Sequence, residues 1–399
     1  MFEKLTTLGP DPILGLNQDF LQDSNPQKIN LSVGVYQDPK GLTPIFTAVK
    51  KAESQLLQAQ QTKSYAPQIG DPAFIEQTTR LIFGDTLVAS YGDRIAGVMT
   101  PGGCGALRMG GELLSQVNDK TTLWVSTPTW ANHYPLLQSA GLTLKEYDYY
   151  DADLHGVNFS ALLESLSKIP QGDVVLLHGC CHNPTGADLT HEQWDSVISL
   201  MAERDLVPFI DVAYQGFGDG LEQDAYAIRQ AAERLPEIIV ASSCSKNFGV
   251  YRERVGAIFV VSQTAEQSNA ARSHILSNAR RSYSMSPYHG GGVVGHLLSD
   301  DALTVEWKTE LEQVRNRMNM LRSKLAQGLN DAQNKIDFEF VARSKGMFCF
   351  LGIEREDVIT LRNEFGLYLL ESTRINVAGL SEQNLPSVIE RVADVITRA

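Results

Sequence analysis

Short apolar runs alternate with amphipathic stretches through the middle of this chain, and no other feature constrains its fold as strongly. The apolar runs lie at Thr122–Ser126, Asp173–His178, Val207–Asp211, Ile238–Ser242 and Val255–Val261. Helical stretches separate most of them, such as His191–Glu203, which follows Thr190, a residue type that caps helices. Buried strands that alternate with helices are typical of a parallel sheet covered on both faces. The pattern therefore predicts an α/β fold.

The C-terminal part of the chain has a different pattern, which predicts a second and smaller domain. Helices are expected at 302–333, 355–365 and 384–397, and short strands at Phe338–Val341, Gly346–Leu351, Leu367–Leu370 and Arg374–Val377. The first ~45 residues are too short and irregular to fold alone, so we expect them to pack on this α+β domain and make it discontinuous. The predicted division is an N-terminal arm and part of the small domain at 1–43, a large domain at 44–313, and the rest of the small domain at 314–399.

The composition limits the classes of partner. Lys and Arg total 34 and Asp and Glu total 47, so the formal net charge is 34 − 47 = −13. An acidic chain is repelled by nucleic acid and by anionic lipid, so we expect neither as a partner. The five scattered cysteines do not suggest a disulfide framework, and the sequence shows no signal peptide and no membrane-spanning stretch. A cytoplasmic protein that acts on small molecules is the expectation.

Four of the predicted strands run directly into segments rich in reactive side chains. These segments are Thr127–His133, His178–Gly186, Asp211–Phe217 and Ser242–Gly249. In an open parallel sheet the carboxyl ends of the strands meet at one edge, and ligands bind there. Packing alone does not explain four such segments at the same edge, so the sequence predicts a chemical site.

Lys246 is the first candidate in these segments. A lysine at a strand end is usually a solvated loop residue, but Lys246 is flanked by Ser243 and Ser245 and followed by Arg254. A nearby guanidinium and a partly dry site lower the pKa of an amine, as a nucleophile requires. Hydroxyls and an arginine also bind phosphate. Asp211 has three readings: a helix cap, a metal ligand, or a carboxylate that keeps a pyridine nitrogen protonated.

Other residues at this edge of the sheet can contact the same pyridine ring. Tyr214 and Asn183 can reach the phenolic oxygen of a pyridine ring. Pro101–Leu107 is rich in glycine and opens a helical stretch, so it is either an ordinary turn or an anion site at a helix N-terminus. Trp130 is either a core residue or a flat ring that stacks on a cofactor.

Together these residues resemble the class I aminotransferases, and within them the bacterial aspartate and aromatic amino acid enzymes. The matching residues are Ser243-x-Ser245-Lys246-x-x-Gly249, Arg254, Asp211-x-x-Tyr214, Asn183-Pro-Thr-Gly186 and Asn376-x-Ala-Gly379. The resemblance runs from Asp11 to the last predicted helix. It implies the type I fold of pyridoxal-phosphate transferases, whose large domain has a mostly parallel seven-stranded sheet covered by helices. It also implies pyridoxal 5'-phosphate as cofactor and a ping-pong transfer of amino groups.

The resemblance assigns a role to each matching residue. Lys246 holds the cofactor and then moves the proton of the substrate, while Asp211, supported by His133, pairs with the ring nitrogen. The other implied cofactor contacts are Tyr214 and Asn183 at the ring oxygen, Trp130 and Ala213 on the two faces of the ring, and Gly102, Gly103, Cys104, Ser243, Ser245 and Arg254 around the phosphate. Catalysis itself is thereby assigned to Lys246, Asp211 and Tyr214.

The substrate contacts implied by the resemblance require two subunits. Arg374 matches the arginine that binds the α-carboxylate of the substrate. Arg280 matches an arginine that binds a distal carboxylate from the partner subunit, and Tyr65 matches a residue that reaches the partner's phosphate. We therefore expect a homodimer with shared active sites. The remaining expected substrate-binding residues are Gly34, Trp130, Asn183, Met285 and Phe348.

A few residues depart from the pattern of the aspartate enzymes. Cys104 stands where a hydroxyl normally donates to phosphate, and a thiol is a weak donor. Met285 replaces a small polar residue near Arg280, and a thioether packs well against aromatic rings. We therefore expect transfer from phenylalanine, tyrosine and tryptophan, and also from aspartate, to 2-oxoglutarate. A dedicated aspartate aminotransferase is the alternative.

Three rival readings are weaker. Gly290-x-Gly292-x-x-Gly295 matches a dinucleotide fingerprint as a string but does not follow a predicted strand. His178, Cys180, Cys181 and His182 invite a zinc site, but the sequence offers no second pair of ligands, and we expect no metal. An aminotransferase-like protein that only binds an effector is the non-enzymatic alternative, against which the intact Lys246, Asp211 and Arg374 argue.

Overall fold

The computed structural model describes residues 1–9, 12–118 and 120–398, and the chain divides into two units. The central unit is residues 44–317, and the discontinuous unit is residues 1–43 together with 318–399. The division falls inside helix α11 (Asp301–Ala332), and the domain boundary expected after residue 313 lies in the same helix.

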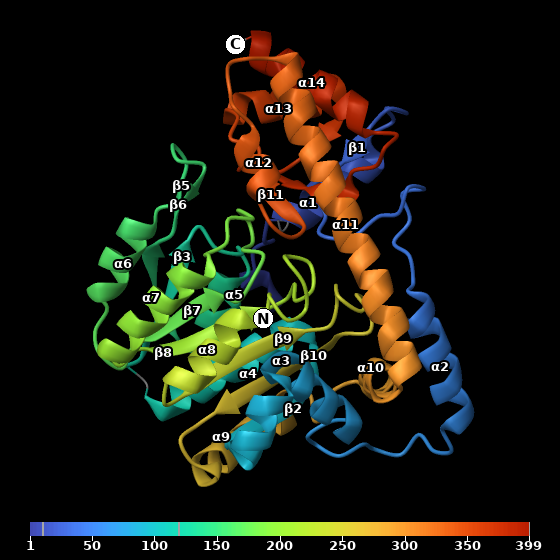
Figure 1. The fold of residues 1–399 in the computed structure, drawn as a ribbon. Coiled ribbons are helices and arrows are strands. Elements are labelled where there is room, and N and C mark those ends of the chain that lie inside the picture. The colour runs from blue at the N-terminus through green and yellow to red at the C-terminus, as the bar shows by residue number, and fades with distance from the viewer. Residues whose placement is uncertain (10–11, 119, 399) are drawn as a thin grey trace. The chain divides into compact units, whose positions relative to one another are not determined.

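A seven-stranded sheet forms the middle of the central unit (Figure 1). Its strands in spatial order are β2 (Ile95–Pro101), β10 (Val255–Val261), β9 (Ile238–Ser243), β8 (Val207–Val212), β7 (Val174–His178), β3 (Thr122–Thr127) and β4 (Thr143–Asp148). Strand β10 is antiparallel to both of its neighbours, and the other pairs are parallel. The mostly parallel sheet is confirmed, and each of the five apolar runs matches a strand to within one residue at either end.

Helices cover this sheet. The helices of the central unit are α2 (Thr47–Ala59), α3 (Pro72–Tyr91), α4 (Gly102–Val117), α5 (His133–Gln138), α6 (Phe159–Ser167), α7 (His191–Glu203), α8 (Tyr226–Arg234), α9 (Ala265–Ser282), α10 (Tyr288–Ser299) and the first part of α11, and its short elements are η2 (Gly92–Arg94), β5 (Tyr150–Asp151) and β6 (Gly156–Val157). Thr190 caps α7 as expected, because its hydroxyl accepts from the backbone N–H of Gln193 and the Gln193 side chain accepts in return.

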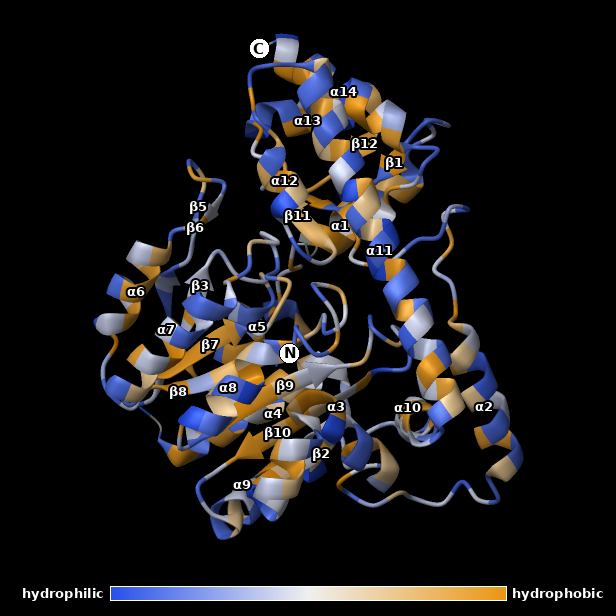
Figure 2. Ribbon diagram, in the orientation of Figure 1, coloured by the Kyte–Doolittle hydropathy of each residue, from blue (hydrophilic) through white to orange (hydrophobic). Residues whose placement is uncertain are grey.

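Both faces of the sheet are buried, which explains why its strands read as continuous apolar runs. Leu176 and Phe209 belong to a hydrophobic cluster that includes residues of α4 and α9. Their sequence neighbours Leu177 and Ile210 point to the opposite face and are also buried. Figure 2 shows hydrophobic residues concentrated in these strands.

The discontinuous unit joins the two ends of the chain. Its elements are η1 (Phe2–Lys4), α1 (Pro12–Gln22), β1 (Ile29–Asn30), the second part of α11, α12 (Glu339–Arg343), β11 (Phe348–Phe350), α13 (Arg355–Phe365), β12 (Leu367–Tyr368), β13 (Arg374–Asn376), η3 (Val377–Gly379) and α14 (Leu385–Arg398). Strand β1 pairs in parallel with β12, and β11 pairs antiparallel with β13. The N-terminal segment is thus part of a sheet whose other strand is near the C-terminus.

One element of this unit was predicted wrongly. Phe338–Val341 was expected to be a strand, but Phe338 caps the helix α12. Phe338 and Val341 are both fully buried, and their spacing of three residues places them on one face of a helical turn. None of the helices in the described residues is long and apolar enough to cross a lipid bilayer.

Candidate active site

The candidate residues of the central unit lie at one edge of its sheet because of the strand directions. The parallel strands β3, β7, β8 and β9 end at the same edge and lead into the four reactive segments. Strand β10 runs the other way, so its first residue, Val255, pairs with Pro101 at the end of β2. Arg254, directly before β10, therefore lies beside the glycines that follow β2.

Lys246 lies in the turn after β9. Its Nζ atom is 4.7 Å from the centroid of the Tyr214 ring. Burial lowers the pKa of the Lys246 amine; the carboxylate of Asp211 opposes this, and the guanidinium of Arg254 adds to it. The amine therefore gives up its proton more readily than a lysine in water, as a general base or nucleophile must.

Asp211, within β8, is held in its charged form. Burial alone would raise the pKa of its carboxyl, but a hydrogen bond with His133 and the nearby His133, His178 and Lys246 outweigh burial and lower that pKa. The Nε2 atom of His133 lies 3.1 Å from Oδ2 of Asp211. A carboxylate that stays ionised in a buried place is able to hold a proton on a heterocyclic nitrogen.

The hydrogen bonds continue beyond His133 to residues that sequence reasoning had not placed in the site. The Thr129 hydroxyl lies 2.8 Å from Nδ1 of His133 and 3.0 Å from Nε2 of His178. Thr129 is thus a bridge between two histidines, and both neighbouring loops had been singled out as reactive segments. The hydroxyl itself carried no signal in the sequence, because a threonine in a Pro-Thr-Trp turn is an ordinary turn residue.

An anion-binding cluster lies where β2, β9 and β10 meet. The Ser243 hydroxyl donates to the Ser245 hydroxyl at 3.1 Å, and Nη1 of Arg254 lies 3.4 Å from the same Ser245 oxygen. Gly102 begins α4 with φ of +71°, and a Cβ atom there would lie 2.5 Å from Nη2 of Arg254. A Cβ atom on Gly103 would lie 3.0 Å from the Ser243 Cβ. Only glycine lets the helix N-terminus approach these hydroxyls and the guanidinium so closely.

Cys104 follows these glycines in the first turn of α4. Burial raises the pKa of its thiol, against the opposing charges of Arg254 and Lys246. The thiol therefore stays neutral at physiological pH, and it is a weak donor toward an anion.

Three further candidates surround this group. The Trp130 ring meets the His133 ring edge to face, with centroids 5.3 Å apart and planes at 84°. Asn183, in the turn after β7, is buried, and so is Tyr214. Ala213 lies between the last residue of β8 and Tyr214, and it is only partly buried.

The discontinuous unit holds a second cluster of candidates. The Arg374 guanidinium lies over the Phe348 ring, 4.1 Å from its centroid, and Nη2 donates to the Ser32 carbonyl oxygen at 2.8 Å. A Cβ atom on Gly34 would lie 2.7 Å from Cζ of Phe348, so the residue must be small there. The Asn376 amide donates to backbone carbonyls on both sides of Gly34. These contacts hold Arg374, Phe348 and Gly34 together as one group.

Tyr65, Arg280 and Met285 stand outside both clusters. The Tyr65 side chain is 90% exposed, and Arg280, near the end of α9, is exposed and donates to the Ser284 hydroxyl. Met285 is partly buried in the segment that follows α9. Within the described part of the chain, neither Tyr65 nor Arg280 forms a hydrogen bond with a residue around Lys246.

The glycine motif of the dinucleotide reading has a packing role. Gly290, Gly292 and Gly295 all lie inside α10. A Cβ atom on Gly290 would lie 2.4 Å from Cγ2 of Val255, and one on Gly295 would lie 2.6 Å from the backbone nitrogen of Phe74. The motif thus allows α10 to pack closely against its neighbours.

The four residues of the zinc reading separate into two groups. His178 and His182 are engaged by hydroxyls, His182 by Ser126 at 2.9 Å and by Thr185 at 2.9 Å. Cys180 and Cys181 instead have potential ligand atoms within 4.8 Å of Asp224. Both oxygens of that carboxylate already accept hydrogen bonds from backbone N–H groups. The histidines and cysteines therefore do not converge on one position.

The sequence of the chain is similar to those of known proteins over nearly its whole length. Residues 26–392 match the family described as aminotransferase class I and II. The chain is 44% identical to an aspartate aminotransferase of Escherichia coli, covering 99% of this chain and 100% of that one. It is 43% identical to an aromatic-amino-acid aminotransferase of Pseudomonas aeruginosa, covering 99% of this chain and 98% of the relative.

A solved structure resembles the whole fold. The crystal structure of an aromatic-amino-acid aminotransferase from Burkholderia pseudomallei, covalently bound to pyridoxal phosphate, matches with a TM-score of 0.95. Its sequence is 38% identical, and the match covers 99% of both chains.

Proposed function

We propose, from the premise that this chain belongs to the aminotransferase class I and II family, that it transfers amino groups from aromatic amino acids and aspartate to 2-oxoglutarate. The chain is an aminotransferase that depends on pyridoxal phosphate. The observation that carries the proposal is the grouping of a buried amine, an ionised carboxylate and an anion-binding cluster at one edge of the sheet.

The donor set fits pyridoxal phosphate. A phosphate needs hydroxyl and cationic donors, and Ser243, Ser245 and Arg254 supply them beside a helix N-terminus that only glycine allows. A pyridine ring needs an acid partner at its nitrogen, and the ionised Asp211 supplies the opposite charge. When bound, the cofactor supplies a ring that accepts electrons from the α-carbon of the substrate.

The residues around that ring divide the remaining work. Lys246 has an amine that loses its proton readily, so it binds the cofactor and then moves the proton of the substrate α-carbon. His133 orients Asp211 through the 3.1 Å hydrogen bond. Tyr214 and Asn183 would bind the ring oxygen, and Trp130 and Ala213 would contact the two faces of the ring.

Two arginines bind the carboxylates of the substrate in this proposal. Arg374, buried and fixed over the Phe348 ring, pairs with the α-carboxylate, because a guanidinium forms two parallel hydrogen bonds to a carboxylate. Arg280 pairs with the distal carboxylate of aspartate, glutamate or 2-oxoglutarate. When an aromatic substrate binds, the exposed Arg280 turns to water and avoids the cost of an unpaired buried charge.

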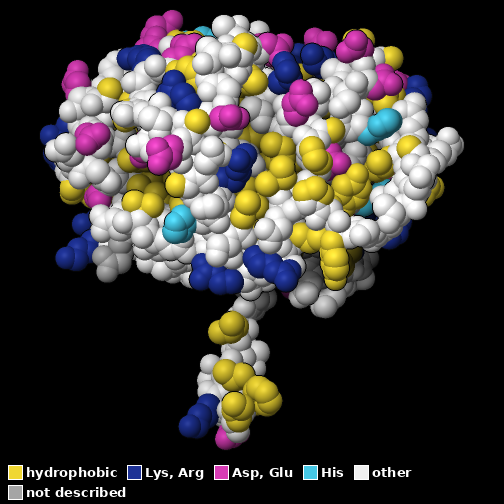
Figure 3. All heavy atoms as spheres, turned by 90° about the horizontal axis from the view of Figure 1, so that it is seen from below, with side chains coloured by type: hydrophobic (Ala, Val, Ile, Leu, Met, Phe, Trp, Pro, Cys, Tyr) yellow, Lys and Arg dark blue, Asp and Glu magenta, His cyan; other side chains and the backbone are white. Residues whose placement is uncertain are grey.

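A homodimer completes the site. The exposure of Tyr65 and Arg280 supports contributions from the partner subunit. Exposed apolar side chains also support an interface between subunits, and Figure 3 shows hydrophobic side chains on the surface. The large apolar side chains that are exposed include Phe2, Leu5, Leu8, Leu14, Leu42, Ile45 and Leu57. We also place the enzyme in the cytoplasm, which the five free cysteines support.

Substrate choice is tested at Met285. The aspartate and aromatic relatives are equally similar, at 44% and 43% identity, so the choice depends on single residues. Met285→Asn should shift the ratio of kcat/KM for aspartate over phenylalanine upward by roughly tenfold, because a polar amide replaces a thioether beside the ring. Met285→Leu, which stays apolar, is the control and should leave the ratio near that of the wild type.

The alternative gives a different result in the same assay. A wild-type enzyme that prefers aspartate by about a thousandfold, roughly 4 kcal/mol in transition-state binding, is a dedicated aspartate aminotransferase. Lys246→Ala tests the mechanism in either case, and transamination should fall by many orders of magnitude. Near-normal turnover of that variant would refute the role given to Lys246.

A further inference from the structure

A cavity lies at the ends of the sheet strands that are opposite the active site. Its volume is about 430 Å³. It is lined by Val174, Val207 and Ile238, the first residues of β7, β8 and β9, and by Val260 near the end of the antiparallel β10. The active site lies at the other ends of these strands. The cavity therefore belongs to the central unit but not to the site described above.

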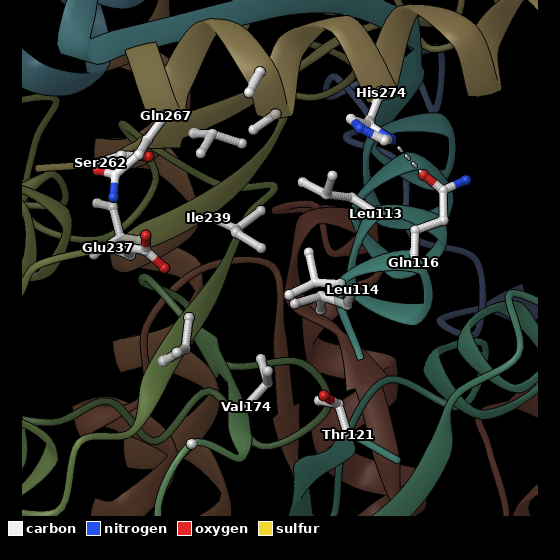
Figure 4. A pocket seen from close by; sticks show the side chains of 17 residues that line it. Leu113, Leu114, Gln116, Thr121, Val174, Glu237, Ile239, Ser262, Gln267 and His274 are labelled. Carbon is white, nitrogen blue, oxygen red and sulfur yellow. Dashed lines mark hydrogen bonds between the residues drawn. The ribbon is translucent and has the colours of Figure 1, made fainter. Parts of the chain in front are cut away.

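The inner wall of the cavity is apolar. Leu113 and Leu114 of α4 and Ile239 of β9 face the same space, as Figure 4 shows. At ~30 Å³ per water, a volume of 430 Å³ corresponds to roughly fourteen water molecules, which is enough for a small organic molecule. Cavities of this size with an apolar wall and few polar groups are typical of ligand sites.

Groups that can donate and groups that only accept hydrogen bonds both lie at the rim: Thr121, Ser262 and Gln267 can donate, and the carboxylate of Glu237 only accepts. Nδ1 of His274 lies 3.1 Å from Oε1 of Gln116, and a carboxamide oxygen only accepts, so Nδ1 carries the proton. Glu237 lies across the cavity from His274 in Figure 4, and its carboxylate has no hydrogen-bond or ion-pair partner among the described residues.

No arginine or lysine is among the described residues that line the cavity. Glu237 is the one carboxylate among those residues, and the whole chain carries a formal charge of −13. Both features favour a cationic ligand over an anionic one.

Hydrogen bonds hold one side of the rim in place. The Gln116 amide donates to Oδ1 of Asn278 at 2.7 Å, and Arg281 donates to the same oxygen. Asn278 is fully buried in α9. Gln116 and His274 are thus oriented before any ligand arrives, which reduces the entropy lost on binding.

We propose that this cavity binds a hydrophobic ammonium ion, a small molecule with an apolar body and one positively charged amine. The apolar body packs against Leu113, Leu114 and Ile239, and the ammonium group pairs with Glu237. The proposal does not depend on the substrates of the enzyme.

The test is calorimetric titration of the holoenzyme with N,N-dimethylphenethylamine. A tertiary amine is used because it cannot condense with the carbonyl carbon of the cofactor. We expect saturable binding at one site per chain, with a Kd on the order of 0.1 mM for a ligand of this size. Glu237→Gln should weaken binding by about two- to fivefold, as expected for one exposed charge pair.

Two variants of α9 locate the binding site. Ala271→Trp fills the cavity from its partly buried wall and should abolish binding, and Ala270→Trp does the same from an exposed lining position if the first variant fails to fold. Ser273→Trp places the same side chain on an exposed position of α9 outside the lining and should bind as the wild type does. Equal binding by all the tryptophan variants, or no saturable binding to the wild type, would overturn the proposal.

Discussion

A chain of hydrogen bonds links Asp211 to His178, the last residue of β7. It runs from Asp211 through His133 and Thr129 to His178, whose ring lies 4.1 Å from that of His182. Burial, followed by the electrostatic effect of the neighbouring His133, lowers the pKa of His178 to about 3, and burial lowers the pKa of His182 well below its usual value. Both outer histidines are therefore neutral at physiological pH.

The neutral histidines predict acid sensitivity. The unfolded chain binds a proton at His182 below about pH 6.5, but the folded chain does not until the pH is much lower, so stability falls as the pH drops below 6.5. Between pH 6.5 and 5 this single group should account for at most about 2 kcal/mol. His182→Gln should lose less stability over this range than the wild type, measured by urea unfolding at each pH. His191→Gln, at the exposed start of α7, is the control. An unchanged pH slope in His182→Gln would contradict the prediction.

Cys104 gives a prediction about cofactor affinity. Because burial keeps its thiol neutral, Cys104 adds little to phosphate binding. Cys104→Ser should bind pyridoxal phosphate more tightly by about 1 kcal/mol, or roughly fivefold, the value of one neutral hydrogen bond. Cys104→Ala, which removes the thiol without adding a donor, should stay close to the wild type. Equilibrium titration of the apoenzyme measures both, and a large loss of affinity in Cys104→Ser would show that the size of the thiol matters more than donation.

The sequence predicted which candidate residues lie at the same end of the sheet better than it predicted the hydrogen bonds between them. Lys246, Asp211 and Arg254 could be predicted to lie there because strand ends in a parallel sheet converge. The bridging role of Thr129 depends on placing two loops to within a hydrogen-bond length, and sequence patterns do not have that precision. The exposure of Tyr65 was likewise found only in the structure, although the family resemblance had implied that the partner subunit uses it.

Elements were predicted well where a single signal dominated. The central strands were found because both of their faces are buried, and α7 was found by its cap. The two outermost strands of the sheet, β2 and β4, were not singled out. Most residues of β4 are exposed, so its sequence lacks an apolar run, whereas β2 is mostly buried and was missed. The error at Phe338–Val341 has the opposite cause, because a short apolar run suits a buried strand and a buried helical turn equally.

Replacing Gly102, which lies between β2 and α4, should weaken cofactor binding. Gly102→Ala should strain the backbone at a φ of +71° and push Arg254 out of the anion-binding cluster. Affinity for pyridoxal phosphate should fall by roughly tenfold or more, since a charge-assisted hydrogen bond is worth about 1.5–3 kcal/mol. Gly172→Ala is the matched control: its φ is +82°, but a Cβ atom there has nothing within 4 Å. That control should lose stability without losing cofactor affinity, and equal affinity losses in both variants would contradict the role of Gly102.

At the scale of the whole molecule, the proposed contribution of Arg280 to the partner's site predicts that two inactive variants restore activity when they form a mixed dimer. Lys246→Ala and Arg280→Ala are each expected to be poor with aspartate. After mixing and subunit exchange, half of the dimers are hybrids with one intact site, so roughly a quarter of the wild-type activity should return. Lys246→Ala mixed with Asp211→Ala is the control and should restore nothing, because both residues lie in the same cluster. A fully active monomer in sedimentation would contradict the shared site.

The pairing of β1 with β12 has a consequence for the order in which the protein is made. Ile29 pairs with Leu367, so 367 − 29 = 338 residues separate the two partners. At ~5–20 residues per second, a ribosome needs roughly 20–70 s to bring the second strand out after the first. Residues 44–317 are contiguous and are complete well before then, whereas the N-terminal segment must wait unpaired. Chains stalled on the ribosome after residue 317 should therefore be cut first within residues 1–43 by a protease, because β1 is separated from its partner by a longer stretch of chain than any other strand in the described residues.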